Sequence, residues 1–121
     1  MAKAPAARAG NSFSELVIKT RNYIRLHFQE ADLTLGRIAD SMFVSASYLS
    51  NLFRKETGMS VTEFILECRM QKAARLIEKT QDCTLAVIAE QCGYNDPYYF
   101  SRSFKKYYGI SPAKYKDQSG L

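Results

Sequence analysis

The stretch TLGRIADSMFVSASYLSNLFRKETGMSVTEF (residues 34–64) recurs, in altered form, as TLAVIAEQCGYNDPYYFSRSFKKYYGISPAKY (residues 84–115). Ten positions are identical once one extra residue is allowed in the turn of the second copy. The identical pairs are Thr34/Thr84, Leu35/Leu85, Ile38/Ile88, Ala39/Ala89, Tyr48/Tyr99, Ser50/Ser101, Phe53/Phe104, Lys55/Lys106, Gly58/Gly109 and Ser60/Ser111. The chain therefore contains a duplicated unit, and any inference from one copy can be checked against the other.

Each copy predicts a helix, a short turn and a second helix. Thr34 and Thr84 are suitable N-caps for the first helix, and apolar residues at helical spacing follow each of them. Gly58 and Gly109 end the second helix, because glycine adopts the left-handed conformation without steric cost. Two helices of about 8 and 12 residues around a turn of about 3–4 residues form a helix-turn-helix. The residues expected to face inward are Leu35, Ile38, Ala39, Met42, Leu49, Leu52 and Phe53, and in the second copy Leu85, Ile88, Ala89, Cys92, Phe100, Phe104 and Tyr107 or Tyr108.

Three further helices complete the predicted fold. One covers about 12–29 and opens with Ser12 and Glu15 at capping-box spacing, a second covers 60–79 with Ser60 and Glu63 at the same spacing, and a short third begins at Ser111. The fold class is all-α: two helix-turn-helix subdomains of homeodomain-like character, joined by a long linker helix, with about seven helices. The predicted segments are a tail (1–11), the first subdomain (12–59), the linker helix (60–80), the second subdomain (81–117) and a tail (118–121).

Two residues of the first copy depart from the pattern of the second. Gly36 lies in the first turn of a helix, where glycine costs up to about 1 kcal/mol relative to alanine. Phe43 stands where the second copy has Gly93, so the first turn is expected to follow a different path.

The second helix of each copy directs a polar stripe away from its apolar one. Both stripes combine serine, an amide or guanidinium, and a basic residue, and neither contains an acid. Asparagine can bond both polar atoms of adenine in the major groove, arginine does the same for guanine, and lysine and arginine bind phosphates. The predicted base-facing residues are Ser47, Ser50, Asn51 and Arg54 (helix 46–57) and Tyr98, Ser101, Arg102 and Lys105 (helix 97–108), and the predicted phosphate-binding residues are Arg37, Lys55 and Lys106.

Two further expectations concern these helices. Glu56 offsets part of the positive charge of helix 46–57, so the second unit is expected to attract DNA more strongly. Among the tyrosines of the second copy, only Tyr98 is expected on the outward stripe, and packing is the better interpretation for the others.

The separation of the two copies favours one duplex as the target. A linker helix of about 20 residues spans about 30 Å, and successive major-groove faces lie about 34 Å apart. The two recognition helices are therefore expected in adjacent segments of the groove, on two unlike half-elements. The bland alternative is that each polar stripe is a solvated helix face, but its recurrence in both copies favours the DNA interpretation.

Composition limits the other function classes. The 121 residues carry 17 Lys and Arg against 12 Asp and Glu, and this mild excess alone is weak evidence for a nucleic-acid partner. Three dispersed cysteines (Cys68, Cys83 and Cys92) suit buried thiols in a reducing compartment, and His27 lacks partners at ligand spacing. No enzyme site, metal, cofactor or membrane span is predicted. A helical protein-interaction module that does not bind DNA is the alternative.

GYNDPYYFSRSFKKYYGISPAKY (93–115), preceded by TLAVIAEQC, closely resembles the signature of the AraC/XylS family of bacterial transcription regulators. LTLGRIADSMFVSASYLSNLFRKETGMSVTEFI (33–65) resembles the first helix-turn-helix of that family, and the likeness covers about residues 13–116. VSASYLSNLFRKETG (44–58) looks most like the C-terminal output domains of YesN-type response regulators.

The resemblance implies a cytoplasmic bacterial regulator that is associated with the nucleoid when bound. It implies seven helices, promoter binding through the two stripes, and activation with contact to RNA polymerase. A sensor or receiver domain usually precedes this module in the family, and none is expected within this chain.

Overall fold

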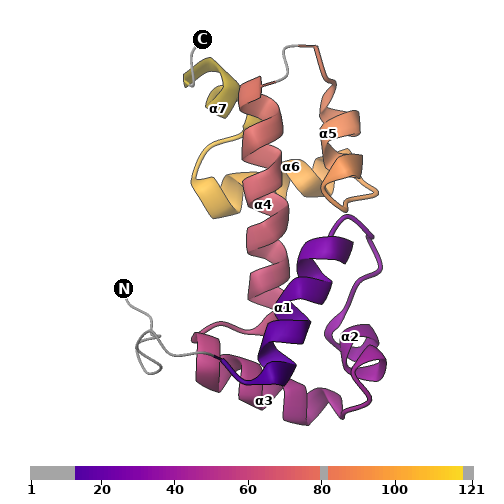
Figure 1. Cartoon of the computed structure of the whole chain (residues 1–121). Helices are drawn as coiled ribbons and strands as arrows, with labels where there is room; N and C mark the ends of the chain where they lie inside the picture. Colours follow the sequence, from indigo (N-terminus) through magenta and orange to yellow (C-terminus); the bar gives the residue numbers. More distant parts are fainter. Residues whose placement is uncertain (1–12, 80–81, 119–121) are drawn as a thin grey trace. The chain divides into compact units, whose positions relative to one another are not determined.

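In the computed structural model, which describes residues 13–79 and 82–118, these residues form helices and no strand (Figure 1). The helices are α1 (Glu15–His27), α2 (Leu35–Ser41), α3 (Ala46–Thr57), α4 (Val61–Lys79), α5 (Leu85–Gln91), α6 (Pro97–Tyr108) and α7 (Pro112–Gln118). The predicted all-α class and the number of helices are confirmed.

The chain divides into two compact units. Each is built around one of the two predicted recognition helices, α3 in the first unit and α6 in the second. The first unit contains α1, α2, α3 and α4 as far as Leu66, and in it both α1 and α2 pack on α3. The second contains residues 28–32, α4 from Glu67 onward, α5, α6 and α7, and in it both α5 and α7 pack on α6.

The start of α4 confirms the capping box predicted from the sequence. The Ser60 N–H donates to the Glu63 carboxylate at 2.8 Å, and the Glu63 N–H donates to the Ser60 hydroxyl at 3.0 Å. Two backbone donors at the helix end are thereby satisfied reciprocally.

The start of α1 is different from the prediction. Ser12 lies outside the described residues, and Ser14 performs the capping: its hydroxyl accepts from the Val17 N–H at 3.4 Å. The Ser14 N–H donates to the Glu56 carboxylate at 2.8 Å. A side chain of α3 therefore satisfies the backbone donor that precedes α1. A partner 42 residues away cannot be seen in a local sequence pattern.

The turns of the two helix-turn-helix motifs follow the same path as far as Val44 and Tyr94, so Phe43 does not divert the first turn as expected. The second turn then contains one more residue before its helix begins. Val44 N–H donates to Ala39 O at 3.1 Å, and Tyr94 N–H donates to Ala89 O at 2.9 Å. Phe43 adopts φ 60°, in the same left-handed region as Gly93. The backbone of the turn overrides the preference of the phenylalanine, whose side chain remains 94% exposed.

The predicted apolar faces form the two cores, with one exception. Leu85 was expected inside and is 38% exposed, because it is the first residue of α5 and borders an open cavity beside α7. Of the pair Tyr107 and Tyr108, Tyr107 is exposed, and Tyr108 turns inward and donates its hydroxyl proton to Met70 O. Buried as predicted are Ile38, Ala39, Leu49, Phe53, Ile88, Ala89, Cys92, Phe100 and Phe104, while Leu35, Met42 and Leu52 are half-buried.

Candidate nucleic-acid interface

Helix α3 has fixed ends and a fixed rotation about its axis. Its N-cap, Ser45, accepts the Tyr48 N–H at 3.0 Å, and its C-cap, Gly58, has φ 80°. Leu49 and Phe53 are completely buried and hold the opposite side outward. Of the predicted base-facing residues on this helix, the exposed ones are Ser47, Asn51 and Arg54, and Ser50 is half-buried.

Helix α6 repeats this construction with different residues. Its N-cap, Asp96, accepts the Tyr98 N–H at 2.9 Å, Pro97 occupies the first turn, and the C-cap, Gly109, has φ 87°. Phe100 and Phe104 are completely buried and lie 5.9 Å apart between ring centroids. The bounds of α3 and α6 agree with the predicted recognition helices 46–57 and 97–108.

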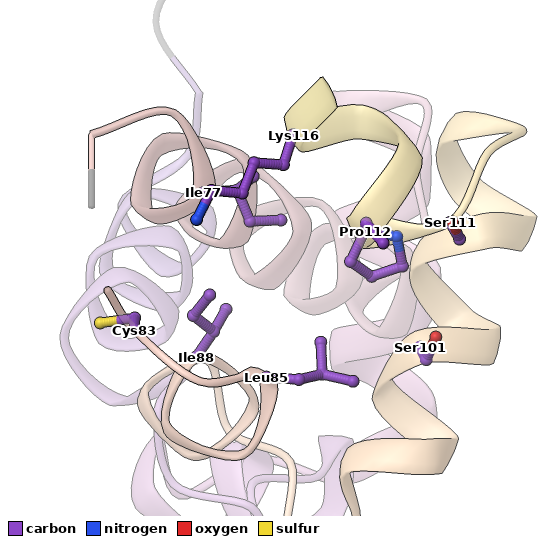
Figure 2. A pocket seen from close by; sticks show the side chains of 9 residues that line it. Ile77, Cys83, Leu85, Ile88, Ser101, Ser111, Pro112 and Lys116 are labelled. Carbon is purple, nitrogen blue, oxygen red and sulfur yellow. The ribbon is translucent and has the colours of Figure 1, made fainter. Parts of the chain in front are cut away.

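Three of the four predicted base-facing residues of α6 are exposed: Tyr98 (74%), Arg102 and Lys105. Ser101 is half-buried and lines a cavity of about 220 Å³ within the second unit (Figure 2). The cavity walls include Leu85 of α5 and Pro112 of α7, which lie opposite Ser101. Ser101 is therefore less accessible than its three neighbours in the set.

The charges around the two stripes are distributed more evenly than the sequence suggests. Glu56, the one acid within α3, is only 5% exposed and accepts the Ser14 N–H, so its carboxylate does not lie on the outward face. Lys55 and Lys106 are exposed at matching positions of the two copies. Arg37, the third predicted phosphate ligand, lies on α2 and is half-buried.

Tyrosines that the sequence did not place on the surface are exposed in both recognition helices: Tyr48 in α3, and Tyr99 and Tyr107 in α6. Tyr48 is 57% exposed and Tyr99 is 54% exposed, although packing was the expected role for all second-copy tyrosines except Tyr98. The guanidinium carbon of Arg102 lies 5.7 Å from the centre of the Tyr99 ring. The i, i+3 spacing of an aromatic and an arginine was the available signal.

The three cysteines lie at buried or half-buried positions. Burial raises the pKa of the Cys92 thiol to about 11, so this side chain is uncharged at neutral pH and acts as a small apolar residue. Cys68 and Cys83 are half-buried and form no disulfide. In residues 13–79 and 82–118, no cluster of three or more potential metal ligands occurs, and no helix has the length and apolar character to cross a bilayer.

The chain is similar to proteins of one family. A family of helix-turn-helix domains matches residues 38–118. The HTH-type transcriptional activator Btr of Bacillus subtilis is 47% identical over 84 residues, which are 69% of this chain and 16% of Btr. The matches cover only 16%, 31% and 22% of the lengths of the first three curated relatives. These relatives are therefore much longer than this chain.

Two solved structures give the same result. The C-terminal domain of AraT, a response regulator from Geobacillus stearothermophilus, has 37% identity and a TM-score of 0.88, and the match covers 92% of this chain and 91% of that domain. The C-terminal domain of the two-component response regulator yesN from Fusobacterium nucleatum has 34% identity and a TM-score of 0.81, over 85% of this chain and 99% of that one.

Proposed function

We propose that this chain, which belongs to the AraC-type helix-turn-helix family of DNA-binding transcription regulators, inserts α3 and α6 into adjacent major-groove segments of one duplex. The observation that carries this proposal is the duplicated outward face. In both copies, buried aromatic and aliphatic residues fix a helix whose opposite side presents an amide or guanidinium followed by a basic residue.

The two recognition helices carry different groups for hydrogen bonding to bases. Asn51 of α3 has the donor and acceptor needed to bond adenine N6 and N7. Arg102 of α6 has the paired donors needed for guanine O6 and N7. Ser47, Ser50, Arg54, Tyr98, Ser101 and Lys105 complete the proposed base-facing set.

Phosphate contacts supply affinity that does not depend on sequence. Lys55 and Lys106 are exposed at the same position of the two recognition helices, where each follows the base-facing stripe. Together with Arg37, they are proposed to bind phosphates and to release condensed counterions.

The whole protein is proposed to activate transcription from a promoter. This part of the proposal rests on Btr, whose name describes an activator, and on the two response regulators whose C-terminal domains share the fold. It includes contact with RNA polymerase, control by a sensor or receiver domain outside the present sequence, and a cytoplasmic location with association to the nucleoid.

Arg102→Ala tests the base-reading role. The chain's preferred duplex should lose about 1–3 kcal/mol of binding free energy, because a bidentate contact to one base is removed. The free energy of binding to a nonspecific duplex should fall much less. Fluorescence anisotropy with both duplexes measures the difference, and an equal loss on both would make Arg102 a phosphate contact.

Lys106→Ala tests the phosphate role. Affinity should fall by a similar factor on preferred and nonspecific duplex, and the slope of log K against log salt should flatten by about one unit, because one fewer phosphate is neutralised. Titrations between about 50 and 200 mM salt measure the slope. A helical protein-interaction module would instead bind neither duplex in a salt-dependent way.

A further inference from the structure

Arg102 lies against an aromatic ring of its own helix. Its guanidinium carbon is 5.7 Å from the centre of the Tyr99 ring, which is within the range of a cation–π interaction. Residues three positions apart are neighbours on a helix surface, so this contact is compatible with the regular geometry of α6. Both side chains are exposed, on the helix proposed to enter the groove.

The Tyr99 ring is anchored on its inner side. Its centroid lies 5.6 Å from that of Tyr94, which is only 7% exposed. Tyr94 in turn packs edge-on against the completely buried Phe100 at 5.4 Å. Tyr99 therefore extends from the core of the second unit to its surface.

Arg69 of α4 completes the opposite end of this arrangement. Its guanidinium carbon lies 5.5 Å from the Tyr94 ring centre. Its Nε donates to Phe28 O at 2.9 Å and an Nη donates to Glu30 O at 2.9 Å, so the group is tied to backbone. Arg69, Tyr94, Tyr99 and Arg102 form a column of successive contacts, in this order, within the second unit, and the two tyrosine rings are tilted by 55° to each other.

The first copy has no counterpart of the column. Val44 occupies the position of Tyr94, because the two N–H groups make the same turn hydrogen bond to Ala39 and Ala89. Tyr48 matches Tyr99, but Asn51 stands at the position of Arg102. The contact between a guanidinium and a tyrosine ring is therefore a feature of α6, and α3 has an amide at the matching position.

We propose that Tyr99 is a positioning residue that holds the Arg102 guanidinium ready to bond a base edge. An arginine side chain loses much rotamer freedom when it binds, and ordering it beforehand removes part of this loss. This inference rests on the proposed function of α6 and adds a residue that does not itself read the base.

The test compares Tyr99→Leu and Tyr99→Phe in the full chain. The probes are the duplex that the wild-type chain selects from random DNA and the same duplex with the Arg102-dependent base pair replaced. Tyr99→Leu should reduce the affinity ratio of the two duplexes by about two- to fivefold, which corresponds to an exposed cation–π contact. Tyr99→Phe should keep the ratio, because the ring and not the hydroxyl supports Arg102.

Two controls separate positioning from other roles. Tyr48→Leu removes the matching exposed tyrosine of the first copy and should leave this ratio unchanged. In an Arg102→Ala background, Tyr99→Leu should have no further effect on the ratio. A loss in Tyr99→Phe, or a loss that persists in the Arg102→Ala background, would mean that Tyr99 contacts DNA directly and would overturn the inference.

A measurement without DNA tests the contact itself. The Arg102 side-chain protons of the wild-type chain should show upfield NMR shifts from the Tyr99 ring, and Tyr99→Leu should abolish them. Unchanged shifts would overturn the inference while leaving the DNA-reading role of Arg102 intact. An Arg102→Ala chain with an unaltered duplex ratio would contradict the function proposed for α6 and the inference with it, even where the shifts report contact.

Discussion

Gly93 lies in the second turn at a position that leaves no room for a side chain. Its φ is 93°, and a Cβ atom built on it would lie 2.4 Å from the carbonyl oxygen of Phe28. The obstacle is backbone held by the Arg69 side chain, which donates to the same oxygen. Glycine is needed at this position for both conformational and steric reasons.

Gly93→Ala should lower the free energy of unfolding by at least about 2 kcal/mol, because left-handed strain and a backbone clash add together. The matched control is Gly109→Ala. Gly109 also has positive φ, 87°, but nothing lies within 4 Å of its Cβ position, so only the strain of about 1 kcal/mol is expected. Urea denaturation followed by circular dichroism compares the two, and equal losses would contradict the clash.

Phe43 shows the opposite relation between residue and backbone. It occupies the Gly93 position of the first copy with φ 60°, and its ring is almost entirely exposed. No rule based on residue type predicts this conformation, because phenylalanine disfavours it. The hydrogen bond from the Val44 N–H to Ala39 O holds the turn locally at the end of α2, and the packing of α2 on α3 adds a tertiary constraint.

At the scale of the element, helix ends were the most predictable features. Ser45 and Asp96 begin α3 and α6, and Gly58 and Gly109 end them, so the bounds follow from local chemistry. Capping of α1 was not predictable in the same way. Its partner, Glu56, belongs to another helix and looked like a surface acid of α3.

Helix α2 contains a glycine, Gly36, at a position where alanine would stabilise the helix. Gly36 is exposed, and a Cβ on it would have only the Thr34 hydroxyl at 4.0 Å, so an alanine fits. Gly36→Ala should raise the free energy of unfolding by about 0.5–1 kcal/mol, because alanine has the higher helix propensity. The reverse change at the matching position, Ala86→Gly in α5, should lower it by a similar amount. Chemical denaturation of both variants tests the pair, and a destabilising Gly36→Ala would contradict the account of α2.

At the scale of the whole molecule, the duplication made the fold predictable. Each copy predicted the same helices independently, and the recurrence of the polar stripe favours a DNA interface over an ordinary solvated face. Accessibility was harder to predict than position. Ser101 lies on the predicted helix but borders a cavity beside α7. Tyr99 is exposed on α6, where its ring contacts both Tyr94 and Arg102.

The proposed function requires α3 and α6 to read two neighbouring segments of one duplex. Selection of binding sites from random DNA, followed by sequencing, tests it most directly when wild type, Asn51→Ala and Arg102→Ala are run in parallel. The wild-type chain should select two unlike short motifs about ten base pairs apart. Asn51→Ala should erase information in one motif only, and Arg102→Ala in the other only. A single motif eroded by both variants, or a pair of identical motifs, would contradict the account.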